Sequence, residues 1–350
     1  MMQTLSGALG LATHDAAFWM PLILVGLFFL TTVAATILDG FDIGVGCLLA
    51  FALPEHRLRM MSLLGPWRDA NGFWLFLGLG LLAAAFPTGW SAIMEHLFLP
   101  MTLLAMGVLL RTAAFELRLR APQALQARWV KVFALGSWLM ALSHGVLLAR
   151  LAGAFAPDVA TPVLAAVFAG FAFASYAVLG ASWLVMREAG PLRPLAAQWG
   201  RQAVRWVAAG AVAVSLVLGL ANTGVFLKWG REAQWGLIGC VWSSLLIIFV
   251  LLEFQLGCLA RGSRHLASLP FLLVVCIFLV VMGGVAYSYF PYLVLDNITV
   301  WDGAVPTRSL MWVLWAALLG LPVALGFNVW VYWGMLGPVR PAQPPPFIMR

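Results

Sequence analysis

Two aspartates stand three residues apart in the segment ILDGFDIGVG, residues 37–46, directly after an apolar stretch that is long enough to cross a bilayer. Asp39 and Asp42 lie on one face of a helix, because side chains at positions i and i+3 are neighbours. Two carboxyl groups this close repel each other when both are ionised, which suits a site that holds a proton. They could instead accept hydrogen bonds from neighbouring helix ends at the membrane surface. The spacing leaves both interpretations open.

Other ionisable residues also stand in or beside apolar segments, where a charge needs a partner. In RTAAFELR, Arg111 precedes Glu116 by five residues, and we expect these two to form a structural ion pair. Asp69 and Asn71 open another apolar segment in GPWRDANGFW. Glu253 has no obvious partner nearby in the sequence, which implies a partner on another helix or another chain.

The sequence offers no set of residues typical of a cofactor or catalytic site. A haem needs axial ligands at matching depth on facing helices, and His144 is the only histidine well inside an apolar segment. The four cysteines are spread through apolar runs without a C-x-x-C pair, so we interpret them as packing residues: Cys47, Cys240, Cys258 and Cys276. We therefore expect no haem, metal or catalytic residue in this chain.

The composition identifies the elements that carry these residues as membrane helices. Apolar residues make up 63% of the 350 residues and charged residues only 9%, and the mean hydropathy is +0.98. A soluble domain is roughly half apolar and a quarter charged. The net charge of +7 is explained by basic loops, so the sequence does not predict a nucleic-acid partner.

Nine apolar segments are each long enough to cross a bilayer, which predicts an all-α polytopic protein. Residues 43–53 extend the first segment but are too short to cross again, so we expect them near the membrane surface. We expect one transmembrane domain over residues 1–338 and a Pro-rich cytoplasmic tail over residues 339–350. The expected spans are residues 17–38, 70–90, 93–116, 130–150, 160–186, 203–226, 236–260, 267–291 and 308–336.

Basic residues predict the orientation of these spans. Of the 20 Lys and Arg residues, 15 fall on one side of the membrane, four on the other and one, Arg111, within a span. Because positive residues mark the cytoplasmic side, the N-terminus is expected outside and the C-terminus inside. Asp39, Asp42 and Asp69 then all lie toward the cytoplasmic face.

Several motifs, in this order along the chain, resemble subunit II of the cytochrome bd-type quinol oxidases. LDGFDIGVG resembles the family signature that ends the first span, and GPWRDANGFWLFLGLGLLAAAFP is similar to the second signature. Further similar stretches are RTAAFELR, GSWLMALSHGVLLA, YAVLGASWLVMREAG and YFPYLVLDNITVWDGA. The resemblance covers nearly the whole chain.

The resemblance implies a fold, a complex and a role. It implies two four-helix bundles plus a peripheral helix, in the inner membrane of a bacterium. It also implies a haem-bearing subunit I that carries haems b and d and oxidises quinol while dioxygen is reduced to water. This chain would carry no haem, support assembly of subunit I and help to supply protons from the cytoplasm. A small single-helix accessory subunit, a structural quinone and a structural lipid are further partners that the resemblance leaves open.

By this resemblance the proton-pathway residues are Asp69, Asp39, Asp42, Asn71 and Glu116. The second signature departs from the family pattern, because Arg68 and Ala70 flank Asp69 and Gly72 stands where a polar residue is common. This departure puts proton transfer at Asp69 in question and is compatible with the cyanide-insensitive branch of the family.

Two functions follow as hypotheses. The first is the non-haem subunit of a proton-consuming, electrogenic quinol oxidase. The second is a secondary transporter in which the paired acids couple protons to a solute. A transporter of that kind is expected to have broken helices in both halves of an inverted repeat, and the sequence has no convincing repeat.

Overall fold

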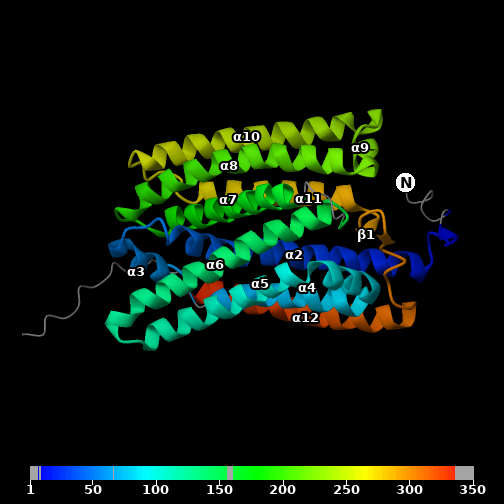
Figure 1. The fold of residues 1–350 in the computed structure, drawn as a ribbon, viewed down its shortest axis with the longest axis horizontal. Coiled ribbons are helices and arrows are strands. Elements are labelled where there is room, and N and C mark those ends of the chain that lie inside the picture. The colour runs from blue at the N-terminus through cyan, green and yellow to red at the C-terminus, as the bar shows by residue number, and fades with distance from the viewer. Residues whose placement is uncertain (1–6, 8, 66, 156–160, 336–350) are drawn as a thin grey trace, which may run out of the picture.

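The computed structural model describes residues 7, 9–65, 67–155 and 161–335, and its helices run side by side along one axis (Figure 1). The expected tail, residues 339–350, lies outside the described residues. In chain order the elements are α2 (Ala16–Leu48), α3 (Pro54–Ser62), α4 (Trp67–Ala85), α5 (Pro87–Arg120), α6 (Gln123–Ala152), α7 (Thr161–Arg187), α8 (Leu192–Ala221), α9 (Thr223–Trp229), the 3-10 helix η1 (Glu232–Gln234), α10 (Trp235–Ala260), α11 (Leu269–Tyr289), β1 (Tyr292–Val294), β2 (Ile298–Thr299) and α12 (Thr307–Met335).

The nine expected spans correspond to the long helices of the described chain. Eight of these helices are long and apolar enough to cross a membrane. The remaining expected span, residues 70–90, corresponds to the 19-residue helix α4. Three polar residues, Arg68, Asp69 and Asn71, occupy the first turns of this short helix.

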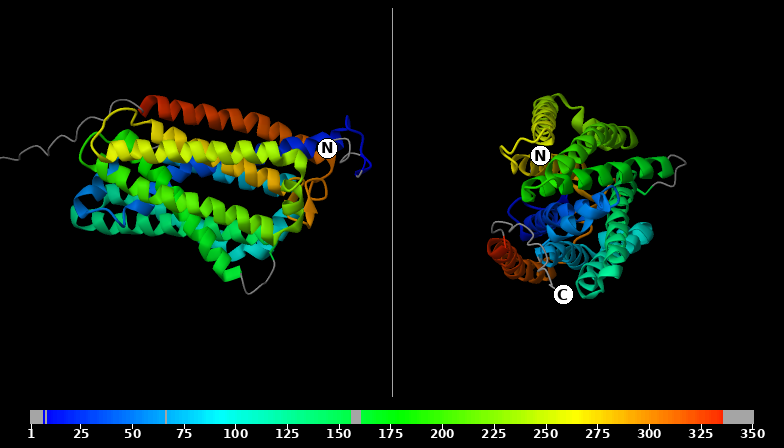
Figure 2. Two further views of the ribbon diagram at one scale, coloured as in Figure 1. Left: turned by 90° about the horizontal axis from the view of Figure 1, so that it is seen from above. Right: turned by 90° about the vertical axis from the view of Figure 1, so that its left-hand side faces the viewer.

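The described long helices form two groups of four, as the resemblance implied. In the first group α2, α4, α5 and α6 surround one another, and in the second α7, α8, α10 and α11 do so. The two groups meet where α7 packs on α2 and α6. Helix α12 lies outside the first group, against α4 and α2 (Figure 2).

The two ends of this bundle differ. One end carries α3 and the turns between α5 and α6, α7 and α8, and α10 and α11 (Figure 1). We call this the α3 end; it holds most of the basic loops and is the cytoplasmic end in the predicted orientation. The opposite end carries α9 and the antiparallel hairpin of β1 and β2, and we call it the hairpin end.

Helix α2 runs further than the sequence predicted. Residues 43–48 continue α2 as helix and are buried. Glycine allows α2 and α7 to approach closely where they cross. A Cβ on Gly44 would fall on the backbone carbonyl of Tyr176, and one on Gly180 would fall on the backbone of Gly44. Asp39 and Asp42 therefore lie inside a helix and not at its end.

The boundary between the second and third spans is also shifted. Helix α4 ends at Ala85 and α5 begins at Pro87, earlier than the expected break at residues 90–93. Within α5 the backbone leaves helical geometry at Leu97, where φ is −117° and ψ is 16°. Pro100 follows three residues later, and its ring clashes with the carbonyl four residues before it in a straight helix. Residues 87–96 thus form a short first segment before the spanning part.

Candidate functional site

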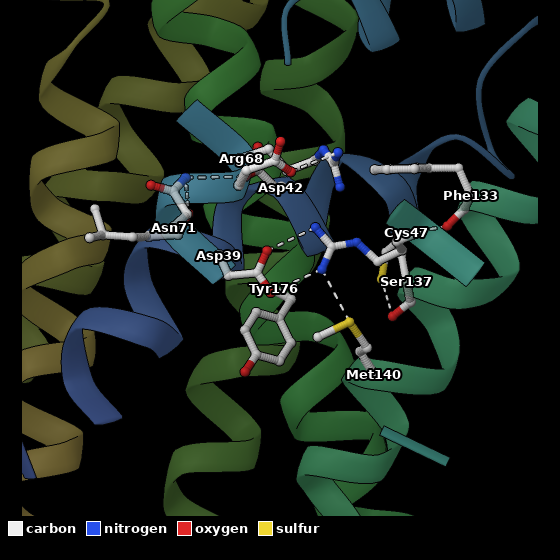
Figure 3. A network of polar contacts seen from close by, with 12 residues as sticks. Asp39, Asp42, Cys47, Arg68, Asn71, Phe133, Ser137, Met140 and Tyr176 are labelled. Carbon is white, nitrogen blue, oxygen red and sulfur yellow. Dashed lines mark hydrogen bonds and ion pairs between the residues drawn. The ribbon is translucent and has the colours of Figure 1, made fainter. Parts of the chain in front are cut away.

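A buried polar cluster lies in the half of the bundle toward the α3 end, between α2, α4 and α5 (Figure 3). Helix α2 contributes Asp39 and Asp42, α4 contributes Arg68 and Asn71, and α5 contributes Arg111. All five side chains are buried in a protein whose spans are otherwise apolar. Burying polar groups is costly unless they are paired, so each contact in this cluster matters.

Asp39 is fully paired with Arg111. The guanidinium donates from Nη2 to Asp39 Oδ1 at 2.9 Å and from Nη1 to Asp39 Oδ2 at 3.0 Å. This two-pronged arrangement matches the planar shapes of both groups. Arg111 also lies above the ring of Phe133, 5.5 Å from its centroid, and contacts the sulfur of Met140.

The expected ion pair between Arg111 and Glu116 is therefore wrong. Residues five apart on a helix point in clearly different directions, because one turn takes 3.6 residues. Arg111 points inward to α2, whereas Glu116 is half exposed and lies 3.8 Å from Arg68 Nη2. The cation in this span is paired across helices and not along its own helix.

Close contact between α5 and α6 brings Arg111 to its place. A Cβ on Gly107 would lie 2.7 Å from the carbonyl oxygen of Gly136, and one on Gly136 would lie 2.8 Å from the carbonyl oxygen of Gly107. Side chains larger than hydrogen at these two positions would push the helices apart. The Arg111 backbone passes beside Gly136.

Asp42 has a different environment. Its Oδ2 accepts a hydrogen bond from Asn71 Nδ2 at 3.1 Å, and the same nitrogen donates to the Leu38 carbonyl at 2.9 Å. Its Oδ1 is buried and has no hydrogen-bond partner among the described residues. Unlike Asp39, Asp42 forms no ion pair with any of the described residues.

Two side chains of α12 support this amide. Tyr332 donates from its hydroxyl to Asn71 Oδ1 at 2.9 Å, and Asn328 donates to the Ala70 carbonyl at 3.0 Å. The Tyr332 bond fixes the amide so that its nitrogen faces Asp42. Sequence reasoning missed both residues, although an asparagine within an apolar span was a signal that could have identified Asn328.

Arg68 links the buried cluster to the surface. Its Nη2 lies 3.0 Å from Asp69 Oδ1, and its guanidinium carbon lies 4.4 Å from the Phe115 ring centroid. The Arg68 side chain is only 5% exposed, whereas the Asp69 side chain is 69% exposed.

A groove of about 190 Å³ between α4 and α5 joins these residues. Asp69 and Arg68 line its outer part, and Asp39 and Arg111 line it as well. Gly72 also lines the groove, and a Cβ added there would meet no atom within 4 Å. The exposed Asp69 and the buried Asp39 therefore line the same groove.

Glu253 finds its partners on the neighbouring helix, as expected. Its Oε1 accepts hydrogen bonds from Arg201 Nη2 and from Arg205 Nη2, each at 2.8 Å. These contacts join α10 to α8, far from the acids of α2 in the sequence. They form a second ion-pair group within the bundle.

His144 is paired in another way. Its Nδ1 lies 3.1 Å from the hydroxyl of Tyr176, across the contact between α6 and α7. Within the part of the chain that the structure describes, no three His, Cys, Asp or Glu side chains come together as metal ligands.

Glu188 fixes the loop after α7 at the α3 end. It accepts hydrogen bonds from Arg59 Nε at 2.6 Å and from the backbone N–H groups of Gly190 at 2.7 Å and Ala189 at 2.9 Å. Burial by itself raises the pKa of Glu188, but the bonds from Arg59 and the two amides outweigh it. The pKa of this carboxyl therefore lies below its ordinary value.

The sequence matches a known family over most of its length. The model of the family described as cytochrome bd terminal oxidase subunit II matches residues 20–335. The chain is 24% identical over 356 residues to cytochrome bd ubiquinol oxidase subunit 2 of Bacillus subtilis (strain 168), with 91% of this chain and 95% of the relative covered. It is also 24% identical to cytochrome bd-I ubiquinol oxidase subunit 2 of Escherichia coli (strain K12), with 85% and 89% covered.

The fold agrees with a solved structure. A chain in the structure of bd oxidase from Geobacillus thermodenitrificans superposes with a TM-score of 0.72 at 16% identity, and the match covers 91% of this chain and 99% of that chain. Because the family match spans most of the sequence, this chain belongs to the cytochrome bd terminal oxidase subunit II family.

Proposed function

We propose that this chain serves a ubiquinol-oxidising, dioxygen-reducing complex by passing protons from the cytoplasmic side through Asp69 and the groove, past Asp39, to Asp42. The observation that carries the proposal is the groove itself, which is lined by an exposed carboxylate and a buried one. Family membership leaves the transporter hypothesis without support. Reduction of dioxygen to water consumes protons, so an oxidase in a membrane needs a protonic route to its interior.

The residues of the cluster would have separate roles in this route. Asp39 is neutralised by Arg111, so it is suited to shaping the route and not to exchanging a proton. Asp42 has one buried oxygen without a partner among the described residues and no cation bound to it. A neutral carboxylic acid is much cheaper to bury than an unpaired carboxylate. Asp42 is therefore the group placed to hold a proton, and Asn71 orients it.

Arg68 and Glu116 would act at the entrance. Asp69 and Glu116 are exposed carboxylates that lie 3.0 Å and 3.8 Å from Nη2 of the buried Arg68 guanidinium. Exposed acids at the mouth of a groove raise the local concentration of cations, including protons. Arg68 keeps these two side chains beside the groove.

The test is the oxidase turnover of the purified complex with Asp42→Asn or Asp69→Asn. Each variant keeps the size of the side chain and removes a titrating group, and we expect turnover to fall by about tenfold or more while haem content stays normal. Glu55→Gln is the matched control, because Glu55 is a 72% exposed carboxylate in α3, at the same end of the molecule. Normal turnover in both Asn variants would exclude the proposed route.

We infer that the haems b and d belong to the partner, subunit I, as is general in this family. This chain expressed alone should then show no Soret absorption. His144→Ala should leave the haem content of the complex unchanged, because the Nδ1 of that ring contacts Tyr176. Loss of a haem band in the variant would show that this chain ligates haem.

A further inference from the structure

A second cavity, of about 320 Å³, lies at the α3 end between the end of α2, α3 and the first turns of α6. It shares no lining residue with the acidic groove. Leu49, Val130, Leu135 and Trp138 make up most of its apolar wall, and Arg57 and Lys131 line it as well. The cavity thus combines an apolar interior with two cations.

The two cations come from different elements and are not used elsewhere. Arg57, in α3, donates from Nε to the Ala52 carbonyl at 3.0 Å, which fixes the position of its guanidinium. Lys131, in α6, is exposed. Within the described ranges, neither side chain forms an ion pair with a carboxylate.

The face of α6 at the cavity changes from charged to apolar along the helix. Arg128, Lys131, Leu135 and Trp138 follow one another at spacings of three and four residues, so they form a single stripe. The cations stand nearest the start of α6 at Gln123, at the α3 end, and the apolar residues lie further along the helix, away from that end. A phospholipid has the same polarity, with its phosphate at the membrane surface and its acyl chains below.

Exposed apolar residues surround the same place. Phe51 and Leu53, between α2 and α3, and Leu58, in α3, are 59%, 56% and 44% exposed. The Phe51 ring stacks on Trp138, with 6.1 Å between their centroids. Aromatic rings of this kind are typical of the level of the lipid headgroups.

We propose that this cavity binds one anionic phospholipid, with its phosphate between Arg57 and Lys131 and an acyl chain along Leu135 and Trp138. A free phosphate ion would leave the apolar wall uncovered, and the ammonium group of a zwitterionic lipid would add a further positive charge beside Arg57 and Lys131. A quinone ring would use the apolar wall but neither cation. The anionic phospholipid is the occupant that satisfies both parts of the cavity. It would also fix α3 to α6.

Native mass spectrometry of the purified oxidase complex tests this site. Arg57→Gln with Lys131→Gln removes both charges, and we expect about thirtyfold weaker retention of one anionic phospholipid, since each basic residue near the membrane surface contributes about a factor of five. Arg57→Lys with Lys131→Arg is the matched control, because it keeps both charges and should keep the lipid. Equal retention in the uncharged and charge-keeping variants would overturn the proposal.

A second measurement uses the unchanged complex and does not depend on the assembly of the variants. After delipidation, the complex is incubated with dioleoyl phosphatidylglycerol, with dioleoyl phosphatidylcholine or with inorganic phosphate. We expect one phosphatidylglycerol to rebind and to raise the melting temperature, and the other two to do neither. Equal effects of the two lipids, an effect of phosphate alone or rebinding of nothing would overturn the proposal. These outcomes are independent of turnover, so they also separate this site from the proton route.

Discussion

Asp39 and Asp42 are less than one helical turn apart, yet the protein surrounds them differently. Arg111 holds both oxygens of Asp39, whereas Asn71 holds one oxygen of Asp42. A buried carboxylate with a bound guanidinium has a structural role, because removing either partner leaves an uncompensated buried charge. The two acids should therefore respond differently to the same substitution.

Asp39→Asn should prevent normal assembly. Loss of the carboxylate leaves Arg111 buried without its counter-charge, which typically costs about 3–5 kcal/mol. We expect a lower melting temperature and less assembled complex in size-exclusion chromatography. Adding Arg111→Gln to Asp39→Asn should restore part of the loss, because it removes the unpaired charge. A normal yield of complex with Asp39→Asn would show that the ion pair is not needed for stability.

Glu188 should make the α3 end sensitive to acid. Its pKa is lower in the folded protein than its ordinary value of 4.5, so its contribution to stability is complete above that value. The contribution is lost as the pH falls below 4.5 toward the folded pKa, because the carboxylate must then be protonated. Melting temperatures measured between pH 7 and about 3.5 should fall more steeply for the natural protein than for Glu188→Gln. Parallel curves would mean that ionisation of Glu188 contributes nothing to stability.

At the scale of elements, glycine decides where helices approach closely. The motif that contains the two acids also contains Gly40, Gly44 and Gly46, and each lies against another helix. The acids and the glycines of this motif have separate physical purposes. The acids form the polar cluster, and the glycines allow α6 and α7 to come near α2.

Gly44→Ala should separate α2 from α7 and lower the stability of the subunit. The added Cβ would overlap the backbone of Tyr176 and Gly180, and overpacking of this kind costs about 1–3 kcal/mol or more. Gly26→Ala in the same helix is the control, because no atom lies within 4 Å of a Cβ there. Thermal melting followed by size-exclusion chromatography should show a loss for Gly44→Ala only. Equal melting temperatures would contradict the observed helix contact.

Gly72→Leu should obstruct the groove without disturbing the packing of α4. A Cβ at this position meets open space, and the longer side chain would extend beside Asp69 and Arg68. We expect turnover to fall by about tenfold if protons use the groove, with a normal yield of complex. Gly80→Leu, about two turns further along α4, also faces open space and should have no effect. Unchanged turnover with Gly72→Leu would mean that the groove carries no protons.

At the scale of the whole molecule, the charged ends and the apolar middle predict how the protein lies in the membrane. The α3 end holds the basic connections between spans, and the hairpin end holds few basic residues. This distribution predicts that Asp69 and the proposed lipid site face the cytoplasm. Both proposals depend on that orientation for their direction.

Single cysteines can determine the orientation directly. In a chain whose native cysteines are replaced by serine, Glu55→Cys marks α3 and Asn297→Cys marks the hairpin, and both positions are exposed. A membrane-impermeant maleimide should label position 297 in right-side-out vesicles and position 55 in inside-out vesicles. The reverse pattern would place the acidic groove on the outer side and exclude a cytoplasmic proton supply through it.

The sequence by itself determined the class of the protein, because long apolar segments have few stable alternatives to membrane helices. It also determined the family, through motifs that follow one another along the chain. It identified Asp39, Asp42, Asp69 and Asn71 as unusual, since polar groups in apolar segments are costly and need a reason. These inferences depend on local composition and order alone.

Only the tertiary structure decided which groups are partners. Asp39 and Arg111 are 72 residues apart, and Asn71 and Tyr332 are 261 residues apart. No spacing along the chain encodes such contacts, because they depend on which faces of separate helices meet. The sequence paired Arg111 with a neighbour on its own helix, whereas helix geometry turned the two side chains apart. The sequence thus predicted where a charge stands along the chain, but the packing of helices through glycine contacts determined which residue is its counter-charge.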